Sequence, residues 1–239
     1  MKRFWLIRPM LLLALTVAPA TGQARPADND ELVERVRQSI EVLQALTSAP
    51  DDAIPEYILE RAEAIVVVPS LVKGGFIVGA EHGRGIMSVR EPARNAWSAP
   101  AFVSMSGGSF GAQIGVQSVD LMLIVVNRDG IDELLKDEFT LGTSASVTAG
   151  PVGRSTKAAT DLLMSAKILA YSRAKGIFAG ATLEGSTLRA DRDANENFYG
   201  MRLDTNDIVI EKQHQVSLPA MAQQWRDTLA RITGSLKRN

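Results

Sequence analysis

The stretch from Ala64 to Gly85 reads AIVVVPSLVKGGFIVGAEHGRG, and it decides the fold. It begins with the run Ile65–Val68, whose β-branched side chains suit a strand that is buried on both faces. Pro69 lacks the N–H that a ladder hydrogen bond needs, so we expect the strand to end there. Lys73-Gly74-Gly75 follows, and paired glycines accept turn conformations at little steric cost. A second apolar run, Phe76–Val78, comes next, so the stretch predicts a hairpin whose turn carries a lysine.

Short apolar segments separated by small or polar residues continue towards the C-terminus. A continuous apolar run such as Leu121–Val126 is typical of a buried strand. Alternating small and β-branched residues, as at 141–149, are typical of an antiparallel strand. We therefore expect strands at 85–90, 101–106, 112–126, 141–149, 166–172, 176–183 and 186–190, with turns at 106–111, Lys175-Gly176 and Glu184-Gly185.

Helices are expected on both sides of these strands. From Asp30 to Leu46, apolar residues recur at steps of three and four and share one face, and short helices are expected near Pro55 and at 131–135. A last helix, Leu218–Ile232, places Trp225 on an apolar face that we expect to dock on the sheet. The alternative for this helix is a position on a membrane surface. The pattern predicts an α+β fold, a largely antiparallel sheet of short strands with N-terminal and C-terminal helices packed on it.

Several blocks of the sequence, in the same order, resemble the SYLF domain family. They are VPSLVKGGFIVGAEHGRG at 68–85, FVSMSGGSFGAQIG at 102–115, AGPVGR at 149–154, YSRAKGIFAG at 171–180 and NENFYG at 195–200. This family occurs in lipid-binding and actin-associated proteins of eukaryotes and in many exported bacterial proteins. The resemblance covers residues 25–239, expected to be one domain. It implies lipid binding, and no catalysis is established for the family as a whole. We expect no enzyme activity and no cofactor.

The first 24 residues have the pattern of a secretory signal peptide. Lys2, Arg3 and Arg8 come first, an apolar run from Met10 to Ala18 follows, and small residues surround an expected cleavage after Ala24. The apolar run is too short to span a bilayer. Without the three cations the net charge moves from −1 to −4. We expect a periplasmic or secreted protein.

The composition excludes several kinds of chemistry. The chain has no cysteine, so it has no disulfide, no thiolate metal site and no lipidated cysteine. With only two histidines, His82 and His214, it cannot build a multi-histidine metal site. The glycines do not form a dinucleotide-binding pattern, and the acidic balance argues against nucleic acid as a partner.

Positive charge is concentrated in one part of this acidic chain. Five cations and a single acid, Asp161, lie between 141 and 180, whereas residues 28–63 carry ten acids and three bases. Segregated cations attract anionic head groups, and backbone N–H groups at glycine turns can also meet phosphate oxygens. The alternative is that these cations pair with the acidic N-terminal helices. The residues expected to hold lipid head groups are Lys73, Gly74, Gly75, Arg84, Arg154, Lys157, Arg173 and Lys175.

Two weaker motifs suggest other chemistry. Gly107-Gly108-Ser109-Phe110-Gly111 matches the G-x-S-x-G pattern of serine hydrolases, and His214 follows downstream acids in the matching order. That pattern needs a strand, a turn and a helix, but strand is expected after Gly111. The run Asp191–Asn197 resembles the start of a calcium loop, although Glu196 stands where the required glycine would be. A polar surface turn is the favoured interpretation, so no metal site is expected.

We conclude from the sequence that this is a non-enzymatic exported protein that binds anionic phospholipid at an envelope membrane surface through a basic patch. The first alternative is a structural or adaptor protein of the envelope that binds another protein. The second is a serine hydrolase that uses Ser109.

Overall fold

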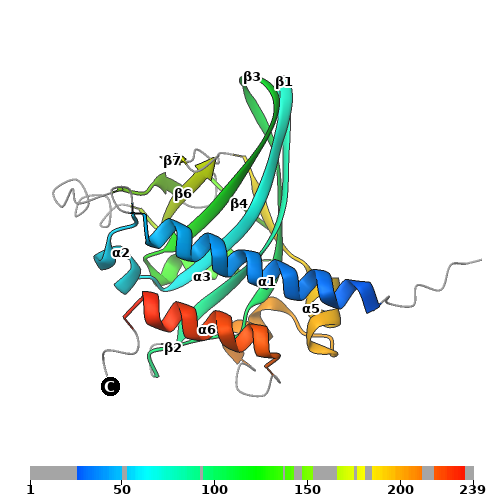
Figure 1. Ribbon diagram of the computed structural model, residues 1–239, viewed down its shortest axis with the longest axis vertical. Helices are drawn as coiled ribbons and strands as arrows, with labels where there is room; N and C mark the ends of the chain where they lie inside the picture. Colours follow the sequence, from blue (N-terminus) through cyan, green and yellow to red (C-terminus); the bar gives the residue numbers. More distant parts are fainter. Residues whose placement is uncertain are drawn as a thin grey trace, which may run out of the picture.

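The computed structural model describes residues 26–49, 53–91, 94–136, 138–142, 147–152, 166–174, 177–180, 185–211 and 218–234. Most of the expected elements are present, in the expected order (Figure 1). The helices are α1 (Pro26–Thr47), α2 (Glu56–Glu60), α3 (Arg128–Leu134), α5 (Arg192–Tyr199), the π-helix η1 (Asp207–Glu211) and α6 (Ala220–Ile232). The strands are β1 (Ala64–Glu91), β2 (Ala96–Trp97), β3 (Ala101–Val125), β4 (Glu138–Thr140), β5 (Val147–Ala149), β6 (Ile168–Ala174), β7 (Ile177–Gly180) and β8 (Thr187–Ala190).

The described strands form one sheet whose main path is β2-β1-β3-β6-β5, with β8 beside β3 and β4. All described pairs are antiparallel except the parallel pair of β5 and β6. Helices α1 and α6 cross one face of this sheet (Figure 1). The expected α+β class with a largely antiparallel sheet is therefore confirmed.

Two strands are far longer than the sequence predicted. β1 spans 28 residues and β3 spans 25, and they pair with each other from Ala64↔Val125 to Met87↔Ala101. The predicted hairpin at Lys73-Gly74-Gly75 and the predicted turn at 106–111 are wrong, because both segments lie inside this pairing. Pro69 does not end the strand either. It lies in an irregularity between Val68 and Leu71, and β1 pairs with β3 on both sides of this irregularity.

The long strand β1 nevertheless doubles back on itself. A straight strand would separate Val67 from Gly85 by roughly 60 Å. A Cβ added at Gly85 would instead lie 2.1 Å from the carbonyl oxygen of Val67, and one at Gly83 would lie 2.7 Å from Val68 Cγ1. The glycine pair of the sequence thus lies near a bend rather than in a turn. The two limbs of β1 do not form the predicted hairpin with each other, because both keep β3 as their partner.

This curl gives the sheet two apolar faces. Val66 and Val68 point into one buried cluster with Leu121 and Leu123, while Ile65 and Val67 belong to a second cluster beneath the helices. The first part of β1 is therefore buried on both faces, as its β-branched run predicted.

The second cluster holds the helices. Ala222, Trp225 and Leu229 of α6 are fully buried, and the indole Nε1 of Trp225 donates to Ser88 Oγ at 2.9 Å. The prediction that α6 docks on the sheet is confirmed, so its apolar face is not available to a membrane. Helix α1 supplies Val36 and Leu43 to the same cluster, beginning four residues before the predicted Asp30.

Helix α5 was not predicted. Its sequence, RDANENFY, is polar, yet Asp191 caps it and Phe198 packs edge-on against Phe102 with ring centroids 4.9 Å apart. The Tyr199 hydroxyl donates to the carbonyl of Pro100 at 2.5 Å, and burial raises the pKa of Tyr199. Tertiary contacts of two aromatic side chains therefore anchor a helix whose sequence is mostly polar.

The close approach at Gly85 makes the fold sensitive to a single methyl group. We expect Gly85→Ala to lower the free energy of unfolding by at least about 3 kcal/mol, because backbone atoms of β1 must move to admit the new Cβ. Urea denaturation followed by circular dichroism would measure this. Gly108→Ala is the matched control, since its nearest neighbour would lie at 3.9 Å. Equal stability of the two variants would contradict the folded-back geometry.

Candidate functional site: the projecting arm and its charges

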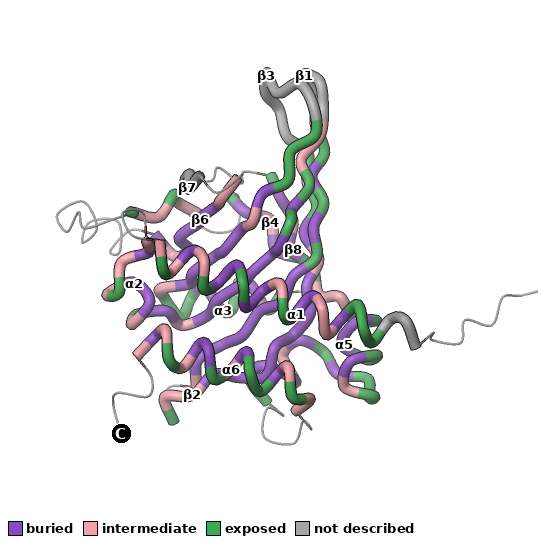
Figure 2. Tube along the Cα trace, in the orientation of Figure 1, coloured by how far each residue is buried: buried purple, intermediate pink, exposed green. Residues whose placement is uncertain are grey.

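The folded-back parts of β1 and β3 project beyond the rest of the sheet. We call residues 72–82 of β1 and 106–118 of β3 the arm. Figure 1 shows the two strands rising together away from α1 and α6, and Figure 2 shows exposed residues on both strands where they leave the body. The arm contains Lys73, Gly74 and Gly75, three of the residues predicted to hold a lipid head group.

An ion pair fastens the two limbs of the arm. Lys73 Nζ lies 3.1 Å from Glu81 Oε2, and the Glu81 side chain is only 3% exposed. The hydroxyl of Ser186, just before β8, donates to the other oxygen of Glu81. Lys73, predicted as a head-group ligand on a turn, lies in a strand. There it compensates a buried carboxylate, which would be costly to leave unpaired.

The outer surface of the arm carries exposed apolar side chains. Val72 is 46% exposed and Val116 is 81% exposed. Val72 is opposite Ser118 and Val116 is opposite Gly74, so both valines lie on one face of the ribbon, because side chains two residues apart share a face. Sequence analysis did not single out these residues, since a valine in a strand is usually buried.

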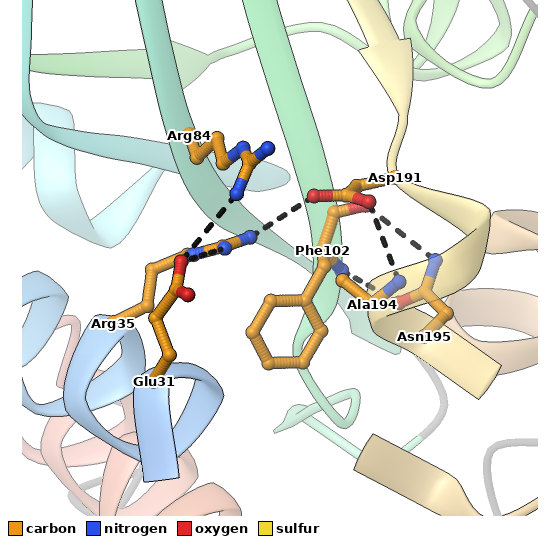
Figure 3. Close-up of polar contacts among 7 residues, drawn as sticks. All are labelled: Glu31, Arg35, Arg84, Phe102, Asp191, Ala194 and Asn195. Carbon is orange, nitrogen blue, oxygen red and sulfur yellow. Dashed lines mark hydrogen bonds and ion pairs between the residues drawn. The ribbon is translucent and has the colours of Figure 1, made fainter. Parts of the chain in front are cut away.

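The predicted cation Arg84 lies at a second cluster, where α1 meets α5 and β3 (Figure 3). Its Nη1 is 3.4 Å from Glu31 Oε1, which also lies 3.3 Å from Arg35 Nη2. Arg35 is nearly buried, with its other nitrogen 3.0 Å from Asp191 Oδ2 and its guanidinium above the Phe102 ring. This network joins α1 to the N-cap of α5, so its structural role is clear.

Asn195 completes the cluster (Figure 3). Its side-chain oxygen accepts the backbone N–H of Phe102 at 2.7 Å, while its amide group faces the Phe102 carbonyl at 3.5 Å. The predicted calcium-like run Asp191–Asn197 thus supplies a helix cap and a backbone clamp. Among the described residues no cluster of three or more metal-ligating side chains is present.

The remaining predicted cations fall in two groups. Arg173 Nη2 lies 3.0 Å from Asp120 Oδ2, and Asp120 Oδ1 accepts the N–H of Ser70 in the irregular part of β1. Arg154, Lys157 and Lys175 lie outside the described residues. Lys73, Arg84 and Arg173 therefore each face an acid, and only Arg84 has its partner on an N-terminal helix.

The serine-hydrolase geometry is absent at Ser109. This residue pairs with Gly79 in the middle of β3, with strand on both sides, whereas a nucleophile elbow requires a strand, a tight turn and a helix. The prediction that these residues form a turn is wrong for the same reason. His214 lies outside the described residues.

Comparison with known proteins identifies the family of this chain. Residues 106–232 match the Ysc84 family, described as "Las17-binding protein actin regulator". The chain belongs to this family, which is the SYLF domain family. The description is that of a regulatory protein rather than an enzyme.

Relatives from fungi and vertebrates show the same likeness. The chain is 35% identical to Protein YSC84 of Saccharomyces cerevisiae over 153 residues, which are 63% of this chain and 32% of the relative. It is 31% identical to SH3 domain-containing YSC84-like protein 1 of Rattus norvegicus over 208 residues, 84% of this chain and 60% of the relative. This chain thus spans a third to three-fifths of these relatives. In the parts of the chain that the structure describes, no helix is long and apolar enough to cross a bilayer.

The ion pair inside the arm can be tested by removing its cation. We expect Lys73→Met to lower the free energy of unfolding by about 3–5 kcal/mol, because Glu81 would remain buried without a counter-charge. Arg84→Met is the control. Its pair with Glu31 is more than half exposed on both sides and should contribute about 0–1 kcal/mol. Urea denaturation at low salt would distinguish the two variants. If Lys73→Met left the free energy of unfolding unchanged, the ion pair would not hold the arm together.

Proposed function

We propose that this protein binds anionic membrane surfaces through the arm. The observation that carries the proposal is the pair of exposed valines, Val72 and Val116, on one face of a ribbon that projects from the body (Figure 2). Apolar groups beside a membrane gain free energy when they enter the acyl boundary.

The sequence of the arm supports the same conclusion. No acidic residue occurs from 72 to 80 or from 106 to 118. Strand segments without acidic residues suit contact with a negatively charged bilayer.

The basic residues supply the electrostatic part of the proposal. Lys73, Arg84, Arg154, Lys157, Arg173 and Lys175, with Gly74 and Gly75, remain the proposed head-group contacts. Arg84 and Arg173 hold acids through partly exposed pairs, which contribute little and exchange readily for an anionic lipid. Lys73 contributes less, since it is committed to Glu81.

The proposal includes export. We propose that residues 1–24 are a signal peptide, that residues 25–239 form one domain, and that the protein works in the periplasm or outside the cell. The order of a charged, an apolar and a small-residue region within residues 1–24 supports the signal peptide. N-terminal sequencing of the exported protein should then read Arg25 first, and recovery of a chain that begins at Met1 would contradict cleavage.

A protein partner is the second candidate function. The yeast relative named LAS seventeen-binding protein 3 binds a protein according to its name, and the family description names the same kind of partner. An exposed apolar ribbon also suits a protein groove. Binding of a protein by this chain, with no response to lipid, would favour this candidate, a structural or adaptor protein of the envelope.

Vesicle co-sedimentation tests the arm directly. We expect Val72→Asp/Val116→Asp to bind vesicles of phosphatidylcholine and phosphatidylserine about tenfold less tightly than the unaltered protein, because two charges must enter the interface. The control is Met201→Asp, an apolar residue 52% exposed that follows α5, away from the arm. Equal loss in both variants, or no loss in the arm variant, would contradict arm-mediated binding.

The same assay separates the basic patch from the arm. We expect Arg154→Glu/Lys157→Glu/Arg173→Glu to lose the part of the binding that high salt removes, since that part comes from cations near the surface. The salt-resistant part should persist in this variant and disappear in the arm variant. Binding that keeps its full salt sensitivity would contradict the basic-patch mechanism.

A further inference from the structure

A small pocket lies away from the arm, between the end of α3, strand β8, the start of α5 and the turn before η1. Its volume is about 200 Å³. Leu134 and Leu188, both buried, contribute apolar wall. The pocket is therefore formed by four elements that the tertiary structure brings together.

Three cations from three of these elements line the pocket. They are Lys136 after α3, Arg189 in β8 and Arg192 at the first turn of α5. One carboxylate, Asp204, lines it as well. The lining groups of the pocket therefore carry an excess of positive charge, in a protein whose overall charge is negative.

Each cation has an acidic neighbour that a stronger anion can replace. Lys136 lies 2.6 Å from Glu133, Arg189 lies 2.9 Å from Glu138, and Arg192 lies 3.4 Å from Asp204. All three cationic side chains are more than half exposed, and ion pairs at such positions are weak. Two guanidinium groups can grip a phosphate with paired N–H donors, which is stronger than a single exposed carboxylate contact.

Thr205 adds an independent observation. The residue lines the pocket and is only 7% exposed, and its hydroxyl oxygen is shielded from solvent with no hydrogen-bond partner in the described structure. A buried hydroxyl without a partner destabilises a folded protein. A ligand oxygen that reached this hydroxyl would remove that penalty, so the free pocket is poised for a polar group.

The size of the pocket limits the ligand. A volume of about 200 Å³ falls below the range of about 300–1,000 Å³ typical of pockets for drug-sized molecules. It corresponds to roughly six or seven water molecules in the liquid. A phosphate attached to a glycerol-sized group is of this scale, whereas a nucleotide is not.

We propose that this pocket binds the phosphomonoester of a small ligand, with Arg189 and Arg192 on the phosphate, Lys136 at the rim and Thr205 donating from the wall. The phosphomonoester can belong to a free metabolite or to a lipid head group. This site is separate from the arm and does not depend on vesicle contact by Val72 and Val116.

Thermal unfolding of the full protein tests the site. With sn-glycerol 3-phosphate at about ten times its Kd, we expect the Tm to rise by about 2–4 °C. Sodium sulfate at equal ionic strength should produce a smaller rise, and an equal rise would overturn phosphomonoester recognition in favour of general anion binding. If the source is a lipid, vesicles with phosphatidic acid should raise the Tm where free glycerol phosphate does not. Absence of both effects would overturn the proposal.

Matched variants locate the effect. Arg189→Gln/Arg192→Gln should lose the ligand-dependent rise in Tm. Arg128→Gln should keep it, since that arginine is equally exposed at the other end of α3 and pairs with Glu63. Loss in both variants would overturn the assignment to this pocket.

Thr205→Val provides a sharper readout. It removes the unpartnered hydroxyl at nearly constant shape, so the Tm without ligand should stay equal or rise while the ligand-dependent shift falls. A purely structural threonine would instead lower the Tm without ligand and leave the shift unchanged, which would overturn its role. The arm variant Val72→Asp/Val116→Asp should retain the shift with glycerol phosphate, so failure of the arm proposal and failure of this one are distinguishable.

Discussion

The structure depends on the pairing of β1 with β3 over a ribbon that folds back on itself. The two limbs of β1 touch at Gly83 and Gly85, where any side chain would meet the backbone or the valines of the first limb. Every other element is placed relative to this contact. β6 extends the ladder from the second limb of β3, β8 pairs with the first limb, and the helices pack on the sheet face that the curl leaves outward.

The curl explains why the sheet has two apolar faces. In a flat antiparallel sheet one face usually meets solvent. Here the inward face closes on itself and the outward face receives α1 and α6, so alternate residues of β1 enter different clusters. Val72 and Val116 are exposed where the ribbon leaves the body.

In the described part of the chain, the predicted cations form local ion pairs. Lys73, Arg84 and Arg173 each meet a carboxylate. The Arg35 pair joins α1 to the N-cap of α5, and the Arg84 pair joins β1 to α1 (Figure 3). The exposed Arg84 pair contributes little stability, whereas Lys73 compensates the buried carboxylate of Glu81.

The sequence by itself determined the local elements and the family. β-branched runs, periodic apolar faces and caps act over a few residues, so the strand beginning at Ala64, the helices α1 and α6 and the class of the sheet followed from pattern alone. Tertiary structure decided the rest. Paired glycines permit a hairpin turn or a bend equally. The two are distinguished only by strand pairing: both limbs of β1 pair with β3 and not with each other, so the glycines lie near a bend. Helix α5, the burial of Glu81 and the pocket at Thr205 depend on contacts between residues far apart in the chain, which local pattern cannot encode.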